Sequence, residues 1–454
     1  MNAPAPTTAA HGSIWSATAP AAPALPVLEG SVDADAVVIG AGFTGLATAL
    51  NLRKAGVDVV VIEAAEPGWG ASGRNNGQVI PTLTRAEPDD IEARFGEVGE
   101  RFVALLRDSA NILFDTVREH GIAAEAEQTG WVQPVHTPGR IAISERRVRQ
   151  WSRRGAPVEL LGATRVREML GSDAWHGGFW NRSGGHVNPL ALARGLARVV
   201  LGVGGRIFAR TPALDYTRAG DQWIVRTPRG QVRARALVLA TNAYTGEFSR
   251  ALAPRIAREV VPVLSWQMAT QPLSDTARVS VIPGRQAMSD THGDLHFARY
   301  DARNRLVTGG AILLPFNRGE RLKAMIGRRL ERLWPQLGPV RFDHVWNGYV
   351  GMTDDYMPRF HQLGPDAWAW AGCNGRAVGL AMALGVEFAK AVRGVPAHEL
   401  ALPLSEPAPL PLHALARRVA PLMLLRYRML DRREIHGLGE PARTKPAGAG
   451  PAGG

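Results

Sequence analysis

Residues 36–63 have the sequence AVVIGAGFTGLATALNLRKAGVDVVVIE, and this stretch decides the fold. The apolar run 36–39 is typical of a strand buried on both faces of a parallel sheet. Residues 46–54 continue as an amphipathic helix that Gly56 ends, and a second apolar run follows at 57–62. The order of strand, helix and strand predicts a complete βαβ unit.

Three glycines in this unit, Gly40, Gly42 and Gly45, match the pattern G-x-G-x-x-G. Glycine at these places permits a tight turn, close approach of backbone amides to a pyrophosphate and close helix–strand packing, and the helix N-terminus favours negative charge. Glu63 closes the second strand, where a carboxylate accepts hydrogen bonds from ribose hydroxyls and repels a 2′-phosphate. These features predict a dinucleotide site that disfavours NADP, against the alternative of a purely structural turn. The predicted contacts are Gly40, Gly42, Phe43, Thr44, Gly45, Glu63 and Ala64.

A second glycine-rich segment, GWGASGRNNGQ at 68–78, follows the carboxyl end of the second strand. Ligands of open α/β sheets bind at that edge, so the backbone amides of this segment can surround the same pyrophosphate. A flexible surface loop is the alternative interpretation. The predicted contacts are Gly70, Ala71, Ser72, Gly73, Arg74, Asn75, Gly77 and Gln78.

The motif GASGRNNGQ at 70–78 closely resembles the signature of the D-amino acid oxidase (DAO) superfamily of FAD enzymes, and within it the γ-glutamylputrescine oxidoreductase-like branch. Later blocks are similar to the same branch and follow in family order: GHVNP at 185–189, ALVLATNAY at 236–244, WNGY at 346–349 and GCNGR at 372–376. The resemblance implies an α/β (mixed α+β) fold. In this fold a Rossmann-like FAD-binding domain is interleaved with a mixed-sheet substrate domain.

Domain boundaries follow from these blocks and from composition. The predicted FAD-binding domain comprises 33–85, 181–250 and 346–405, and the predicted substrate domain comprises 86–180 and 251–345. Residues 1–32 are rich in Ala and Pro and lack a basic region before an apolar run, so they predict a disordered arm and not a signal peptide. A basic helical segment is expected at 406–436 and a disordered tail at 437–454. Residues 88–120 predict two helices.

The residue patterns of two later blocks also predict secondary structure near the nucleotide edge of the first sheet. The apolar run 237–240 predicts another strand of the first sheet, and the residues after it return to the nucleotide edge. Residues 376–392 predict a close-packing helix, and the resemblance implies that its N-terminus faces the pyrimidine side of the flavin, where the helix dipole stabilises negative charge. Simple helix packing is the alternative. The predicted contacts are Thr241, Asn242, Gly372, Asn374, Gly375 and Arg376.

Two departures from relatives bear on the chemistry. Val350 stands where amino-acid-oxidising relatives commonly place an Arg that grips the substrate carboxylate, before the T-x-D-x-x-P element at 353–358. A plain D-amino acid is therefore disfavoured, and an amine, or a carboxylate held farther from the flavin, is favoured. Gly351 stands where sarcosine oxidase-like relatives attach FAD through a Cys, and Cys373 belongs to the later motif. We therefore expect noncovalent FAD.

The resemblance implies oxidation of a C–N bond. Hydride passes from the carbon beside a neutral amine to flavin N5, the imine hydrolyses, and oxygen reoxidises the flavin; a γ-glutamylputrescine-like amine is the favoured substrate. The alternatives are a dehydrogenase of the same fold that uses a quinone or protein acceptor and, more remotely, a flavin-dependent RNA-modifying module. No catalytic residue is assigned. The pocket candidates are Gln78, Arg299, Trp346 and Tyr349, and the candidate bases are His186, His292, His296 and His344.

Composition sets the wider frame. A chain of 454 residues with 45% hydrophobic and 21% charged residues predicts two or three globular units. The one cysteine allows no internal disulfide and no cysteine cluster, so we expect a cytoplasmic protein without a metal site. The net charge of +12 is spread along the chain, which favours solubility over nucleic-acid binding.

The segment 412–435 interleaves Leu, Val, Met and Tyr with six arginines. This pattern predicts a basic amphipathic helix that is interrupted near Pro421. We expect this segment to pack on the body of the protein, and peripheral contact with a membrane is the less favoured alternative.

Overall fold

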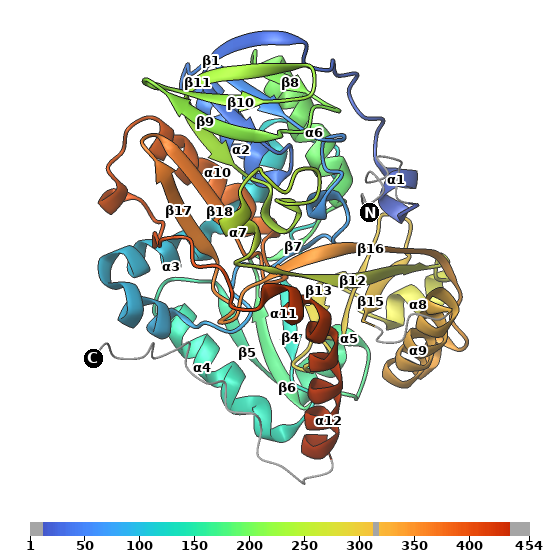
Figure 1. Cartoon of the computed structure of the whole chain (residues 1–454). Coiled ribbons are helices and arrows are strands. Elements are labelled where there is room, and N and C mark those ends of the chain that lie inside the picture. Colours follow the sequence, from blue (N-terminus) through green and yellow to red (C-terminus); the bar gives the residue numbers. More distant parts are fainter. Residues whose placement is uncertain (1–11, 312–316, 436–454) are drawn as a thin grey trace.

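The βαβ unit lies at the centre of the first sheet of the computed structural model, which describes residues 12–311 and 317–435 (Figure 1). It consists of β1 (Gly30–Ile39), α2 (Phe43–Lys54) and β2 (Val59–Ile62), and it confirms the prediction from the apolar runs and glycines. In parallel register, Ile39 pairs with Ile62 of β2 and with Leu239 of β11. The carboxyl ends of these strands therefore meet at one edge.

The first sheet has eight strands, and its continuous path runs β17-β18-β11-β1-β2-β8. The neighbours from β18 to β8 are parallel, whereas β17 and the β9–β10 hairpin are antiparallel to their neighbours. The additional strands are β8 (Arg206–Phe208), β9 (Asp215–Ala219), β10 (Gln222–Arg226), β11 (Gly230–Leu239), β17 (Arg359–Gly364) and β18 (Ala367–Ala371).

Four helices form one apolar core with a face of this sheet: α2, α3 (Pro88–Glu119), α6 (Pro189–Gly202) and α10 (Val378–Val392). The helical path of α3 is broken at Gly96, where φ is 56° and ψ is −136°, as the prediction of two helices requires. The predicted boundaries assign α3 to the substrate domain. It packs instead on α10, because its apolar side chains, among them Phe102 and Leu113, join the core of the first sheet.

The second sheet also has eight strands, in the order β16-β12-β15-β14-β13-β4-β6-β5. All pairs are antiparallel except β13 with β4. The strands are β4 (Trp131–Pro134), β5 (Val158–Gly162), β6 (Gly177–Asn181), β12 (Val261–Thr270), β13 (Ala287–Ser289), β14 (Phe297–Tyr300), β15 (Leu306–Gly310) and β16 (Phe342–Met352). The predicted boundary at 346 is therefore wrong, because β16 pairs along its whole length with β12.

The two sheets are interleaved along the chain, which confirms the predicted fold class. A two-stranded sheet of β3 (Gln78–Val79) and β7 (Gly185–His186) lies outside both. Apart from α1 (Ile14–Thr18), the remaining α-helices are α4 (Ile141–Ser152), α5 (Ala163–Leu170), α7 (Pro254–Ala257), α8 (Asp275–Ser280), α9 (Arg318–Leu333), α11 (His413–Val419) and α12 (Met423–Ile435). A 3₁₀ turn at Ala420–Leu422 separates α11 from α12, as predicted from Pro421. Within 12–311 and 317–435, no helix has both the length and the apolar character that crossing a bilayer requires.

The predicted disordered arm is wrong for residues 12–32. Helix α1 (Ile14–Thr18) begins after Ser13, whose side chain accepts the N–H of Ser16, and Trp15 is fully buried. Farther along, Leu25 and Leu28 are also buried. A few apolar side chains therefore anchor a segment whose Ala- and Pro-rich composition suggests disorder. Residues 1–11 and the predicted tail 437–454 lie outside the described residues.

The turn between β1 and α2 depends on two glycines. Gly40 has φ +106°, a conformation that residues with a side chain rarely adopt. A Cβ atom at Gly45 would lie 1.9 Å from the carbonyl oxygen of Gly40. Close helix–strand packing, the predicted role of this third glycine, is confirmed.

Gly45→Ala should lower the free energy of unfolding by about 3 kcal/mol, because the added methyl group forces α2 away from β1. Gly202→Ala is the matched control, since Gly202 is also a helical glycine, the last residue of α6, and has no atom within 4 Å of a built Cβ. Thermal and denaturant unfolding measure both variants. Equal stability of Gly45→Ala and the parent chain would show that the helix does not need this close approach.

Candidate active site

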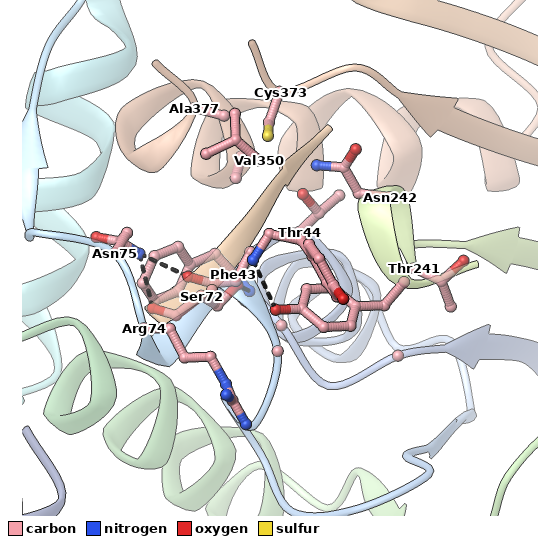
Figure 2. A pocket seen from close by; sticks show the side chains of 18 of the residues that line it. Phe43, Thr44, Ser72, Arg74, Asn75, Thr241, Asn242, Val350, Cys373 and Ala377 are labelled. Carbon is pink, nitrogen blue, oxygen red and sulfur yellow. Dashed lines mark hydrogen bonds between the residues drawn. The ribbon is translucent and has the colours of Figure 1, made fainter. Parts of the chain in front are cut away.

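A cavity lies where the carboxyl ends of the first sheet face the second sheet (Figure 2). It encloses about 320 Å³, which falls in the range of about 300–1,000 Å³ that small-molecule sites occupy. One side is formed by the ends of β1 and β2, the start of α2 and the loop 68–78. The other side is formed by β12, β13, β14 and β16 of the second sheet. Both sheets therefore contribute to a single site.

The start of α2 and the loop 68–78 are in direct contact. The backbone N–H of Phe43 donates to Ser72 Oγ at 3.0 Å. A Cβ atom at Gly42 would lie 2.8 Å from the same oxygen, so only glycine lets the loop come this close. The two glycine-rich segments thus present their backbone to the same part of the cavity, next to the positive end of the α2 dipole.

Glu63 lines the cavity at the end of β2. Its carboxylate accepts the backbone N–H groups of Ala41 at 2.8 Å and Ala65 at 2.9 Å. Burial raises the pKa of Glu63, and these two N–H groups act in the opposite direction. The carboxylate is thus held in a fixed orientation at the nucleotide end of the cavity.

Three side chains from distant segments hold the loop at residues 74–76. The backbone carbonyl oxygens of these three consecutive residues accept, in order, Trp346 Nε1 at 2.8 Å, Trp15 Nε1 at 2.9 Å and Arg299 Nε at 2.7 Å. Arg299 is fully buried, and its guanidinium carbon lies 4.4 Å from the ring centroid of Trp15. Burial lowers the pKa of Arg299 to about 10. We name Trp15, Arg299 and Trp346 the loop clamp.

The four pocket candidates divide into two groups. Gln78 and Tyr349 line the cavity. Arg299 and Trp346 do not, because Arg299 Nε and Trp346 Nε1 donate to backbone carbonyls of the loop behind the cavity wall. Arg299 Nη2 donates to the carbonyl of Val187. Arg299 and Trp346 therefore hold the cavity wall in place from behind and do not line the cavity themselves.

The predicted cofactor contacts divide in the same way. The following residues line the cavity: Gly40, Gly42, Phe43, Thr44, Glu63, Ala64, Gly70, Ala71, Ser72, Arg74, Asn75, Gln78, Thr241, Asn242, Gly375 and Arg376. Five others do not: Gly45, Gly73, Gly77, Gly372 and Asn374. These five permit close packing behind the wall. For example, Gly77 has φ +79°, and the side chain of Asn374 accepts the N–H of Thr353 at 2.9 Å.

Sequence reasoning missed most of the second-sheet wall. The missed lining residues there are Ser265, Gln267, Ser289, Leu295 and Phe297. Their positions depend on which face of a strand turns toward the cavity, and no local motif marks that choice. Tyr244 was also missed, although it ends the block 236–244; its hydroxyl accepts the N–H of Tyr349 at 3.0 Å.

Several polar atoms of lining residues have no hydrogen-bond partner among the described residues. Among them are the buried oxygens Thr44 Oγ1, Gln78 Oε1 and Gln267 Oε1. Buried polar atoms normally have partners, so these atoms indicate that a bound molecule completes the site. The donors and acceptors at the nucleotide end, together with the glycine cradle, fit a dinucleotide.

The charged residues among the cavity lining are Glu63, Arg74 and Arg376. Arg376 donates through Nη1 to Thr82 Oγ1 and to the carbonyl of Leu83, both at 3.0 Å, and burial lowers its pKa to about 9. Within the described residues the lining includes no histidine, so none of the four candidate bases reaches the cavity wall. Two of them, His292 and His296, lie beside the carboxylate of Asp290 instead.

A glycine cradle at the ends of parallel strands, joined to a second sheet by one cavity, is typical of dinucleotide-dependent oxidoreductases. The sequence profile described as "FAD dependent oxidoreductase" (DAO) matches residues 35–391, so the chain belongs to this family and FAD is its cofactor. The predicted resemblance to the DAO superfamily is thereby confirmed.

Individual relatives agree with the family assignment. The chain is 31% identical over 369 residues to gamma-glutamylputrescine oxidoreductase of Escherichia coli, which covers 81% of this chain and 85% of the relative. It is also 31% identical over 370 residues to the probable oxidoreductase OrdL of Haemophilus influenzae, covering 80% and 83%. Glycine oxidase from Geobacillus kaustophilus has the same fold, with a TM-score of 0.66 at 20% identity over 81% of this chain and 96% of that chain.

Trp15→Phe should weaken FAD binding about tenfold, because the carbonyl of Asn75 loses its donor inside a buried clamp. Fluorescence titration of the apoprotein with FAD measures the dissociation constant. Trp223→Phe is the matched control, since it removes an equivalent bond from Nε1 to the carbonyl of Pro365, at 2.9 Å, in the β9–β10 hairpin. Equal FAD affinity of both variants would contradict the assigned role of the clamp.

Proposed function

We propose that this chain oxidises the carbon–nitrogen bond of an amine that also carries a carboxylate, with γ-glutamylated diamines as the favoured substrate class and oxygen as the electron acceptor. The observation that carries the proposal is the single cavity that joins the dinucleotide cradle to the wall of the second sheet. The similarity to gamma-glutamylputrescine oxidoreductase supports the substrate class.

The residues at the nucleotide end are those that would hold FAD. The backbone of Gly40–Thr44 and of the loop 70–75 would hold the pyrophosphate, and Glu63 the ribose. Asn242, Gly375 and the start of α10 would border the ring system. When bound, the flavin ring supplies the acceptor for the hydride removed from the carbon beside the amine.

Two glutamines supply uncharged acceptors at the second-sheet side. Gln78 donates from Nε2 to the carbonyl of Met288 at 3.0 Å, and Gln267 donates from Nε2 to Ser265 Oγ at 3.0 Å. The Oε1 atom of each has no partner among the described residues. Amide oxygens accept an amine N–H without the stabilisation of the ammonium form that a carboxylate provides. They therefore suit the neutral amine that hydride transfer requires.

The charge of the cavity selects against free polyamines. Arg74 and Arg376 line it, and the one carboxylate in the described lining, Glu63, lies at the nucleotide end. A free diamine carries two positive charges into this environment. γ-Glutamylation converts one of its amines into an uncharged amide and adds an α-ammonium together with a carboxylate, so the net charge falls to +1. Val350 also lines the cavity, in the position that the resemblance assigns to a carboxylate-gripping Arg. The carboxylate of the substrate is therefore held away from the reacting carbon.

Under anaerobic conditions, γ-glutamylputrescine should bleach the flavin absorbance near 450 nm at least about tenfold faster than putrescine, sarcosine or D-alanine. The higher positive charge of putrescine disfavours its binding, and Val350 disfavours the amino acids sarcosine and D-alanine. Stopped-flow absorbance measures the rate, and admission of air should restore the absorbance quickly. Fastest bleaching by putrescine or D-alanine would contradict the substrate class. If the flavin absorbance recovers slowly in air but rapidly after a quinone is added, the electron acceptor is a quinone and not oxygen.

We also propose that FAD is held noncovalently. Cys373 lines the cavity beside Gly351, and its sulfur accepts the backbone N–H of Gly351 at 3.3 Å. The same thiol is directed at the carbonyl of Gly351 at 3.8 Å. This backbone pairing gives the only cysteine in the sequence a structural partner next to the position where relatives attach FAD.

Acid precipitation of the purified protein should leave all yellow colour in the supernatant, for the parent chain and for Cys373→Ser alike. Absorbance of the redissolved pellet under denaturing conditions provides the measurement. A yellow pellet from the parent chain that becomes colourless in Cys373→Ser would overturn noncovalent binding and identify the attachment point.

A further inference from the structure

The outward surface of residues 412–435 exposes an unusual amount of apolar area. Twelve large apolar side chains are exposed in the described part of the chain, and eight of them lie in this segment. They are Leu412, Leu415, Val419, Leu422, Met423, Leu425, Met429 and Ile435. We name this surface, which follows α11 and α12 along the outside of the molecule, the C-terminal strip (Figure 1).

The same surface is strongly basic. Its exposed arginines are Arg417, Arg418, Arg426, Arg432 and Arg433. The two acidic residues of the segment do not balance them, because Asp431 is buried and the side chain of Glu434 is only 6% exposed. The C-terminal strip therefore offers apolar side chains and positive charge together, which is the composition of helices that lie in a membrane interface.

The inward face of α12 is already bound to the body of the protein. Asp431 accepts the N–H of Gly293 at 3.0 Å, and Arg428 donates to Asp294 at 2.9 Å. Glu434 forms a two-pronged ion pair with Arg140, with both bonds at 2.7 Å. The predicted packing on the body is confirmed by these bonds. Because the polar inward face makes them, the exposed apolar side chains have no place left in the core of this chain.

A second copy of the chain fits this surface poorly. In a two-fold symmetric dimer the same patch meets itself, so the five exposed arginines would face one another without acidic partners. An anionic surface matches the charge, and a lipid bilayer also accepts the apolar side chains. We propose that the C-terminal strip binds the surface of a membrane that contains anionic lipid. This inference is independent of the proposed function, because no residue of the strip lines the cavity.

Sedimentation of the FAD-loaded full-length protein with sucrose-filled vesicles tests the inference. Two kinds of vesicle are compared at low salt: pure phosphatidylcholine, and phosphatidylcholine in which about one lipid in three is phosphatidylglycerol. The vesicles with phosphatidylglycerol should bind the chain at least about tenfold more tightly. Near 0.5 M NaCl, where screening leaves only about 4 Å of electrostatic reach, the difference should largely disappear. Leu425→Ser with Met429→Ser, and separately Arg426→Gln with Arg433→Gln, should each weaken binding about tenfold.

The matched control is Arg218→Gln with Arg229→Gln, which removes the same charge from exposed positions near β9 and β10, at the opposite end of the molecule from α12 (Figure 1). This double variant should bind vesicles like the parent chain. Absence of binding to anionic vesicles would overturn the inference, and so would an equal loss in the control. Self-association that depends on Leu425 and Met429, measured by light scattering in the absence of lipid, would overturn it in favour of a second copy.

Discussion

Three hydrogen bonds to consecutive backbone carbonyls of residues 74–76 hold the cavity together. Their donors come from the N-terminal segment, from β14 and from β16, so the loop that belongs to the first sheet is fixed by the second sheet and by the start of the chain. The guanidinium of Arg299 is buried, and besides its bond to the loop it donates to the carbonyl of Val187 at 2.8 Å. The loop clamp thus couples both sheets at the point where the cofactor loop meets the substrate wall.

The sequence predicted those parts of the site that depend on local geometry. Glycine spacing located the turn after β1, because Gly40 and Gly45 must permit a close approach whatever lies elsewhere. Prediction from the sequence failed where strand pairing between distant segments sets the direction of a side chain. Arg299 and Trp346 lie on strands of the second sheet but point at the loop, and composition gave no sign that Trp15 is buried. Trp15 follows Ser13, a helix-capping residue, and that short pattern was the available signal.

The chemistry of the cavity and the chemistry of the surface are separate. Inside, the cavity wall is mainly uncharged and includes two arginines, and the substrate that we propose for it is an amine that carries its own carboxylate. Outside, positive charge and apolar side chains gather on the C-terminal strip, away from the residues that line the cavity. The five exposed arginines of the C-terminal strip are part of the net charge of +12.

A crystal structure of the protein grown with FAD tests the central claim most directly. We predict that the flavin ring lies in the cavity beside Asn242, Gly375 and the start of α10, with the pyrophosphate at the start of α2 and the adenine end toward Glu63. The three carbonyls of 74–76 should still be bound by Trp346, Trp15 and Arg299. FAD bound outside this cavity, or a loop 74–76 that leaves its three donors when FAD is present, would contradict it.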